Sequence, residues 1–275
     1  MRVGTHMSFR PPYFYRTMRP ARTKKTRTFR QKSRDAYLEV RGSLLDRIRR
    51  ITQSGYQNVL EEAFQIATQR RLTGDYVEFG VYTGRSFIQA FHILNHYRAQ
   101  DQFRMFAFDS FSGIPALATS DEVRYGDFAG GAFACSEDEF VQNIRAFGVP
   151  TEVMVAVPGF YEQTCTRETA ERIGLAKVSV VMIDCDILSS TLTALRFISP
   201  YLEDGAVVIF DDWNHYRSHP QLGERGALSE WLQEQTEFIV TPIRDSALGA
   251  GMFSFHRRLS AHEHRAREVS RAPGG

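Results

Sequence analysis

Two apolar runs of this chain end abruptly on carboxylates, and this feature constrains the fold more than any other. The first run reads Val-Met-Ile-Asp-Cys-Asp at 181–186, and the second reads Val-Val-Ile-Phe-Asp-Asp at 207–212. Short runs rich in Val and Ile are typical of buried strands in a parallel sheet. Because residues just past such strands face the crevice where α/β proteins bind ligands, we expect the aspartates to share one crevice.

Carboxylates that lie this close repel one another unless a proton or a cation sits between them. A hard divalent cation such as Mg²⁺ suits a site that offers only oxygen ligands. The pattern therefore predicts an enzyme with a metal site at the ends of two neighbouring strands.

Strands and helices alternate through most of the chain. Apolar runs predict seven strands, at 76–81, 103–108, 153–157, 178–183, 206–210, 238–243 and 252–256. Apolar spacing and capping signals predict helices at 36–51, 58–69, 86–97, 136–147, near 166–173, 190–201 and 222–235. A short Gly-containing turn joins the last two strands, so they must be antiparallel. We predict an α/β fold with a doubly wound, seven-stranded, mostly parallel sheet, an antiparallel last strand and N-terminal helices.

Charge divides the 275-residue chain, although its formal net charge is only +2. Residues 1–34 hold eleven Lys or Arg and no acid, and the remainder carries 23 basic and 32 acidic residues, a net charge of −9. We interpret 1–34 as a disordered basic arm, 35–73 as N-terminal helices, 74–258 as the main domain and 259–275 as a disordered tail. Such an arm is usually a solvated tail, but nucleic acid, a membrane surface or an acidic partner would also suit it.

The sequence predicts a cytoplasmic protein. No apolar run is long enough to cross a membrane, and the N-terminus lacks the apolar segment of a secretory signal, although an Arg-rich transit peptide fits the arm. The three cysteines, Cys135, Cys165 and Cys185, lack metal or redox spacing, and their odd number favours a reducing compartment.

A strand, a turn and a helix follow one another at 74–86. Gly80 and Gly84 let the backbone approach a ligand, and the turn directs helix N–H groups toward it. A plain tight turn between strand and helix explains this pattern equally well. Asp109 ends the next strand, where α/β nucleotide folds hold ribose hydroxyls, or else it caps a turn. Together the two features favour an adenosine ligand.

Four motifs occur in order: Val-Glu-Phe-Gly-Val-Tyr-Thr-Gly at 77–84, Phe-Asp-Ser-Phe-Ser-Gly-Ile-Pro at 108–115, Ile-Asp-Cys-Asp at 183–186 with Ser-Ser-Thr at 189–191, and Asp-Asp at 211–212. Over residues 74–257 the chain resembles the macrocin and mycinamicin O-methyltransferase family, the TylF/MycF type. These are class I, Rossmann-like enzymes that use S-adenosylmethionine and Mg²⁺ to methylate sugar hydroxyls of natural products.

The resemblance implies site residues. It assigns S-adenosylmethionine binding to Glu78, Gly80, Tyr82, Gly84, Ser86, Asp109, Ser110 and Phe111. It assigns Mg²⁺ to Asp184, Asp211 and Asp212, with Asp184 also the catalytic general base, and leaves Asp186 as a supporting group. It implies a glycosylated small-molecule acceptor and a homo-oligomer in which the N-terminal helices form a lid or interface.

Three further features lie close to the aspartate motifs in the sequence. The family usually has Leu-Tyr after its Asp-x-Asp motif, whereas this chain has Ile187-Leu188, so we expect a different acceptor pocket. His215, in the loop after the last aspartate pair, is more often a surface residue than a participant in proton removal. Glu224 begins a helix, where an acid favours the helix dipole.

Two alternatives stay open at this point. One keeps the cofactor but changes the acceptor to a phenol, an amine, a peptide or an RNA, and the basic arm is the feature that favours RNA. The other is a non-enzymatic nucleic-acid-binding protein that uses the arm. The clustered aspartates count against the second, because a scaffold gains nothing from them.

Overall fold

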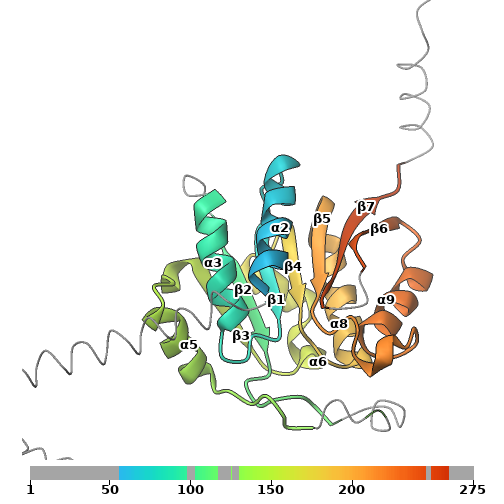
Figure 1. Cartoon of the computed structure of the whole chain (residues 1–275). Coiled ribbons are helices and arrows are strands. Elements are labelled where there is room, and N and C mark those ends of the chain that lie inside the picture. Colours follow the sequence, from blue (N-terminus) through green and yellow to red (C-terminus); the bar gives the residue numbers. More distant parts are fainter. Residues whose placement is uncertain (1–55, 98–102, 117–124, 126–129, 246–248, 260–275) are drawn as a thin grey trace, which may run out of the picture. The chain divides into compact units, whose positions relative to one another are not determined.

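Runs of β-branched and aromatic residues form the strands of one sheet (Figure 1). The computed structural model describes residues 56–97, 103–116, 125, 130–245 and 249–259. The predicted arm, the predicted helix at 36–51 and residues 260–275 of the predicted tail lie outside the described residues. The strands are β1 (Asp75–Phe79), β2 (Met105–Asp109), β3 (Met154–Pro158), β4 (Val178–Ile183), β5 (Leu202–Phe210), β6 (Phe238–Arg244) and β7 (Gly251–Arg257).

The strands lie in the order β3-β2-β1-β4-β5-β7-β6. The five strands from β3 to β5 in this order pair in parallel, and β7 is antiparallel to both β5 and β6. This arrangement confirms the predicted doubly wound, mostly parallel sheet with a reversed last strand. The sequence indicated that β6 and β7 are neighbours, but not that β7 lies between β5 and β6.

Helices pack on both faces of the sheet. They are α2 (Tyr56–Gln69), α3 (Arg85–Tyr97), α5 (Glu137–Ala146), α6 (Tyr161–Thr164), α7 (Arg167–Ile173), α8 (Leu188–Ile198) and α9 (Gly223–Glu234). Side chains alternate across a strand, so neighbouring residues of β1 belong to different buried clusters. Tyr76 belongs to the cluster that includes residues of α2, α3 and α5, and Val77 to the cluster that includes residues of α7, α8 and α9. Every residue of β4 is buried, as the apolar run predicted.

Local signals placed most helix starts correctly. The Ser136 hydroxyl accepts a hydrogen bond from the Glu139 N–H at 3.2 Å, which confirms the predicted N-cap of α5. The prediction missed α6, a single turn between β3 and α7. It also began β5 four residues late, because the polar sequence at 203–205 hides a strand start at which Leu202 pairs with Val178.

Backbone hydrogen bonds continue past the strand ends and align them at one edge of the sheet. Gly80 N–H donates to Phe108 C=O at 2.9 Å, Asp184 N–H donates to Phe79 C=O at 2.8 Å, and Asp211 N–H donates to Ile183 C=O at 3.0 Å. The glycine turn and both acidic segments are therefore held side by side.

Gly80 allows this close approach. Its φ is +84°, and a Cβ added there would lie 1.9 Å from the Asp184 carbonyl oxygen. No side chain larger than hydrogen fits without moving the end of β1 away from β4.

We predict that Gly80→Ala lowers the free energy of unfolding by about 3 kcal/mol or more, since it combines a backbone clash with an unfavourable φ. Gly148→Ala is the matched control, because Gly148 has a φ of +80° but nothing within 4 Å of an added Cβ. The control should lose only about 1 kcal/mol. Urea unfolding measures both, and equal losses would contradict the steric explanation.

Candidate active site

A cavity of about 330 Å³ lies at the carboxyl ends of the strands, a volume typical of small-molecule sites. Both parts of the predicted site line it. They include Gly80, Tyr82, Asp109, Ser110, Asp184, Asp186, Asp211, Asp212 and His215. The glycine turn and the acidic strand ends therefore face the same space, as the sequence predicted.

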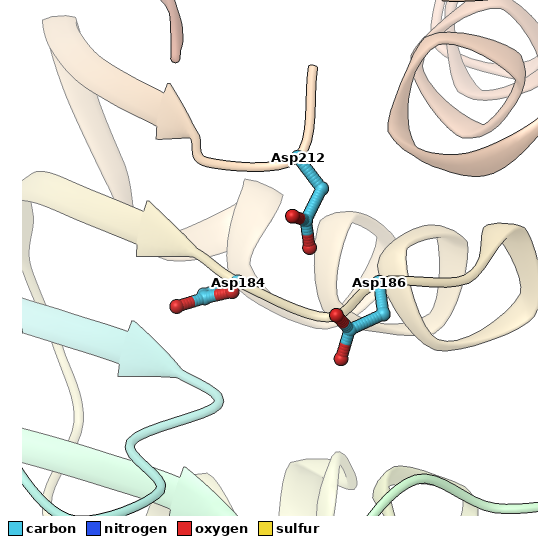
Figure 2. A group of neighbouring side chains, drawn as sticks. All are labelled: Asp184, Asp186 and Asp212. Atoms are coloured by element: carbon cyan, nitrogen blue, oxygen red, sulfur yellow. The ribbon is translucent and has the colours of Figure 1, made fainter. Parts of the chain in front are cut away.

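Three aspartates form a tight group in this cavity. Asp184, Asp186 and Asp212 each place one carboxylate oxygen within 4.8 Å of the other two. Figure 2 shows them at the ends of neighbouring strands, Asp184 and Asp186 after β4 and Asp212 after β5. Asp211 lines the cavity but lies outside this group. The structure thus brings together two of the three predicted metal ligands with Asp186, which we had interpreted as a supporting group.

Asp186 reaches the group because of its backbone conformation. Its φ is +64°, in the left-handed region that Asp tolerates better than most residues, and Ile187 N–H donates to Cys185 C=O at 2.6 Å across the same turn. Spacing along a strand does not reveal such a turn. An Asp at the junction between a strand and a helix was the available signal.

Crowding and burial raise the pKa values of these acids. Burial, followed by the charges of Asp211 and Asp212, raises the pKa of Asp184 well above its ordinary range. Burial, followed by Asp212, raises the pKa of Asp186 to about 9. A bound cation would relieve this repulsion, and oxygen-only donors within mutual reach fit a hard divalent ion such as Mg²⁺.

Asp109 organises the two loops that border the cavity on the side of the glycine turn. One carboxylate oxygen accepts hydrogen bonds from the N–H groups of Val81 and Tyr82 at 2.8 and 3.0 Å, and the other accepts from Phe111 N–H at 2.8 Å. Asp109 therefore caps a turn, as one sequence interpretation had it. It also lines the cavity, which the ribose-binding interpretation requires. Its contact with a ribose stays a prediction.

Four of the predicted cofactor residues do not line the cavity in the described structure: Glu78, Gly84, Ser86 and Phe111. Glu78 is fully buried and accepts hydrogen bonds from the hydroxyls of Tyr76 at 2.6 Å and Ser86 at 2.5 Å. An added Cβ on Gly84 would lie 3.0 Å from Phe140 of α5. These residues support the turn from behind, and their role toward the cofactor stays a prediction.

Tyr82, one of the predicted cofactor residues, forms an aromatic pair at the cavity with Phe133, which the sequence analysis did not single out. Tyr82 and Phe133 are 45% and 51% exposed, and their rings meet edge to face with centroids 5.7 Å apart. Both have positive φ values, 44° and 56°. Phe133 lies in the irregular segment before α5, where no periodicity marks it. The pair offers an apolar surface to a ligand that enters the cavity.

The remaining expectations concern residues near the aspartates. His215 is exposed, as expected of a surface residue, and its Nε2 lies 3.3 Å from an Asp212 carboxylate oxygen where it lines the cavity, so a part in proton removal stays a prediction. Ile187 is fully buried and Leu188 packs against the core, and neither lines the cavity. Burial raises the pKa of the Cys185 thiol well above its ordinary value, in keeping with a packing role.

The seven-stranded, mostly parallel sheet with its reversed β7 matches the fold of solved methyltransferase structures. The structure of the O-methyltransferase NovP aligns with a TM-score of 0.60 at 20% identity, covering 74% of this chain and 79% of that one. The calicheamicin methyltransferase CalS11 aligns with a TM-score of 0.58 at 23% identity, covering 73% and 77%. At these identities the two structures establish the fold alone.

The chain belongs to the Macrocin-O-methyltransferase (TylF) family, whose model matches residues 6–228. It is 28% identical over 145 residues to the 8-demethyl-8-(2,3-dimethoxy-alpha-L-rhamnosyl)-tetracenomycin-C 4'-O-methyltransferase of Streptomyces olivaceus. It is 26% identical over 162 residues to the mycinamicin III 3''-O-methyltransferase of Micromonospora griseorubida. These matches cover 51% and 57% of this chain, and 53% and 61% of the relatives' own lengths.

Glu78 makes stability depend on pH. Burial raises its pKa from 4.5 to about 7, against the opposing effect of the Ser86 and Tyr76 hydrogen bonds. Because the folded-state pKa is raised, the contribution of Glu78 to the free energy of unfolding is fully present below about pH 4.5. That contribution is lost as the pH rises through about 7. Gln at this position does not titrate. We therefore predict that the free energy of unfolding of Glu78→Gln, minus that of the wild type, rises by about 3 kcal/mol as the pH is raised from 4.5 to 8.

Urea unfolding of both proteins across this range measures the difference. Glu139→Gln, at an exposed glutamate in the first turn of α5, is the control and should follow the wild type. A Glu78→Gln difference that stays flat with pH would contradict the raised pKa.

Proposed function

We propose that this chain is a Mg²⁺-dependent O-methyltransferase that moves a methyl group from S-adenosylmethionine to a sugar hydroxyl of a secondary metabolite. One observation carries the proposal: the group of Asp184, Asp186 and Asp212 shares a cavity with the glycine turn at Gly80 and with Asp109. A cation bound by these aspartates would share one space with a cofactor bound along Gly80 and Asp109.

The names of the two curated relatives support the acceptor class. One is named for the 4'-position of a rhamnosyl-tetracenomycin, and the other for the 3''-position of mycinamicin III. Both positions are on sugars attached to a larger aglycone. The exposed Tyr82–Phe133 pair at the cavity supports an acceptor of this kind, because it offers apolar contact outside the polar acid group.

Methyl transfer from a sulfonium is an in-line displacement in which the S–C bond breaks as the O–C bond forms, and the acceptor hydroxyl loses one proton. Mg²⁺ held by the aspartates supplies Lewis acidity toward that hydroxyl. The protein's own groups fix the two reactants in line and accept the proton. The backbone bonds of Gly80 and Asp184 to neighbouring strand ends keep these two sides of the cavity at a fixed separation.

Asp184 is our proposed general base and cation ligand, as the family resemblance implies. Asp186 is a second candidate for the base, because it belongs to the same group, lines the cavity and is less buried than Asp212. Substituting each separately distinguishes the two.

We predict that Asp184→Asn lowers kcat by at least about 100-fold, because it removes a proton acceptor and a cation ligand together. The assay measures release of S-adenosylhomocysteine with a panel of rhamnosylated aromatic and macrolide acceptors, with and without Mg²⁺. Calorimetry with S-adenosylhomocysteine should give nearly unchanged affinity for this variant, since the cofactor side of the cavity is intact.

Asp138→Asn, at an exposed residue of α5, is the control and should behave as the wild type. A larger loss in Asp186→Asn, with turnover retained in Asp184→Asn, would transfer the role of base to Asp186. Turnover that is independent of Mg²⁺ and of both aspartates would refute the proposed mechanism.

Other sequence predictions stay predictions: a cytoplasmic location, a homo-oligomer, and a lid or interface formed by residues 35–73. The basic arm lies outside the described residues, so no structural observation favours the RNA or nucleic-acid-binding alternatives. Within residues 56–259, as far as they are described, no helix is long and apolar enough to cross a membrane.

A further inference from the structure

Glu224 is a buried carboxyl that the proposed mechanism does not use. It lies in the first turn of α9 and is only 1% exposed. Both of its carboxylate oxygens are buried and have no hydrogen-bond partner among the described residues. An acid can favour the helix dipole from solvent, as the exposed Glu137, Asp138 and Glu139 do in the first turn of α5, so the dipole does not explain the burial of Glu224.

Both neighbours of Glu224 contact the segments that carry the aspartates. An added Cβ on Gly223 would lie 3.7 Å from the Asp186 carbonyl oxygen, and Arg225 Nε donates to Trp213 C=O, directly after Asp212, at 2.8 Å. Burial, followed by the charges of Asp212, Asp184, Asp211 and Asp186, raises its pKa well above the ordinary value. The neighbouring Arg225 does not neutralise it, because its guanidinium bonds to Trp213 C=O, Asn214 and Asp245. In the part of the chain that the structure describes, no basic side chain forms an ion pair with Glu224.

A buried carboxyl without a partner is costly, and four aspartates nearby increase the cost. A positive charge at the aspartate group would reverse the sign of this interaction, because Glu224 would then face a net attraction in place of repulsion. Glu224 is not one of the three residues whose oxygens lie within mutual reach, so it would act on a bound cation through its charge and not as a ligand.

We propose that Glu224 is a positioning residue of the cation site: a carboxylate behind Asp184, Asp186 and Asp212 that strengthens binding of a divalent cation without being one of the three grouped ligands. The inference rests on the proposed cation dependence. It extends that proposal by adding a residue from α9, an element that carries none of the ligands implied by the family resemblance.

Titration of the whole protein with Mn²⁺, followed by the electron paramagnetic resonance of free Mn²⁺, tests this inference without any acceptor. Glu224→Gln should raise the Mn²⁺ dissociation constant about tenfold or more, the effect expected for groups that support metal ligands. Glu224→Asp retains the charge and should stay within about threefold of the wild type. Glu230→Gln, an exposed substitution on the same helix, should leave the constant unchanged.

Thermal unfolding without metal separates this role from a packing role. Glu224→Gln removes an unpaired buried carboxyl, so its midpoint should not fall below that of the wild type. Equal loss of affinity in Glu224→Asp and Glu224→Gln, with lower midpoints, would overturn the inference in favour of packing.

Two other outcomes distinguish the inference from the proposed function. If the wild type and Glu224→Gln bind Mn²⁺ equally, the inference fails while the cation dependence stands. If the wild type binds no Mn²⁺, the cation dependence fails and the inference fails with it.

Discussion

Electrostatic repulsion among carboxylates at the ends of β4 and β5 is the constraint on which the account of this protein depends. The backbone imposes it, because hydrogen bonds from Asp184 and Asp211 to the neighbouring strand ends fix where the acidic segments begin. These bonds keep the backbone of the two acidic segments close together. The sheet therefore holds Asp184, Asp186 and Asp212 within mutual reach, and the energy of that crowding is available for binding a cation.

The other parts of the site are arranged around this constraint. Gly80 lets β1 approach β4 closely enough for the glycine turn to border the same cavity as the acids. Asp109 accepts hydrogen bonds from backbone N–H groups of the two loops beside that turn and so fixes this side of the cavity. Tyr82 and Phe133 add an apolar edge. The result is a cavity with a polar acid group, a backbone-lined turn and an aromatic rim.

The fold was largely predictable from sequence because its signals are local. The apolar runs of β1, β4 and β5 specify buried strands, and the Ser136 cap specifies the start of α5. Family resemblance and strand ends together indicated where Asp184 and Asp212 would meet. The position of β7 inside the sheet was not predictable in this way, because a hairpin specifies a neighbour and not an order.

The residues that sequence reasoning did not place in the site depend on non-local contacts or on backbone conformation. Asp186 enters the acid group through a left-handed φ, and Phe133 reaches the cavity from an irregular segment. Glu224 has the sequence context of an ordinary acid near a helix start, and only its burial near the aspartates distinguishes it. Strand and helix periodicity carry no information about such contacts.

A crystal structure of the wild type with S-adenosylhomocysteine and Mn²⁺, with anomalous diffraction recorded at the manganese edge, tests the central claim most directly. The account predicts one strong anomalous peak coordinated by oxygens of Asp184, Asp186 and Asp212, with Asp211 as a further neighbour, and the cofactor product bound along Gly80 and Asp109. Manganese bound away from these aspartates, or a cofactor product that occupies the aspartate group itself, would contradict it.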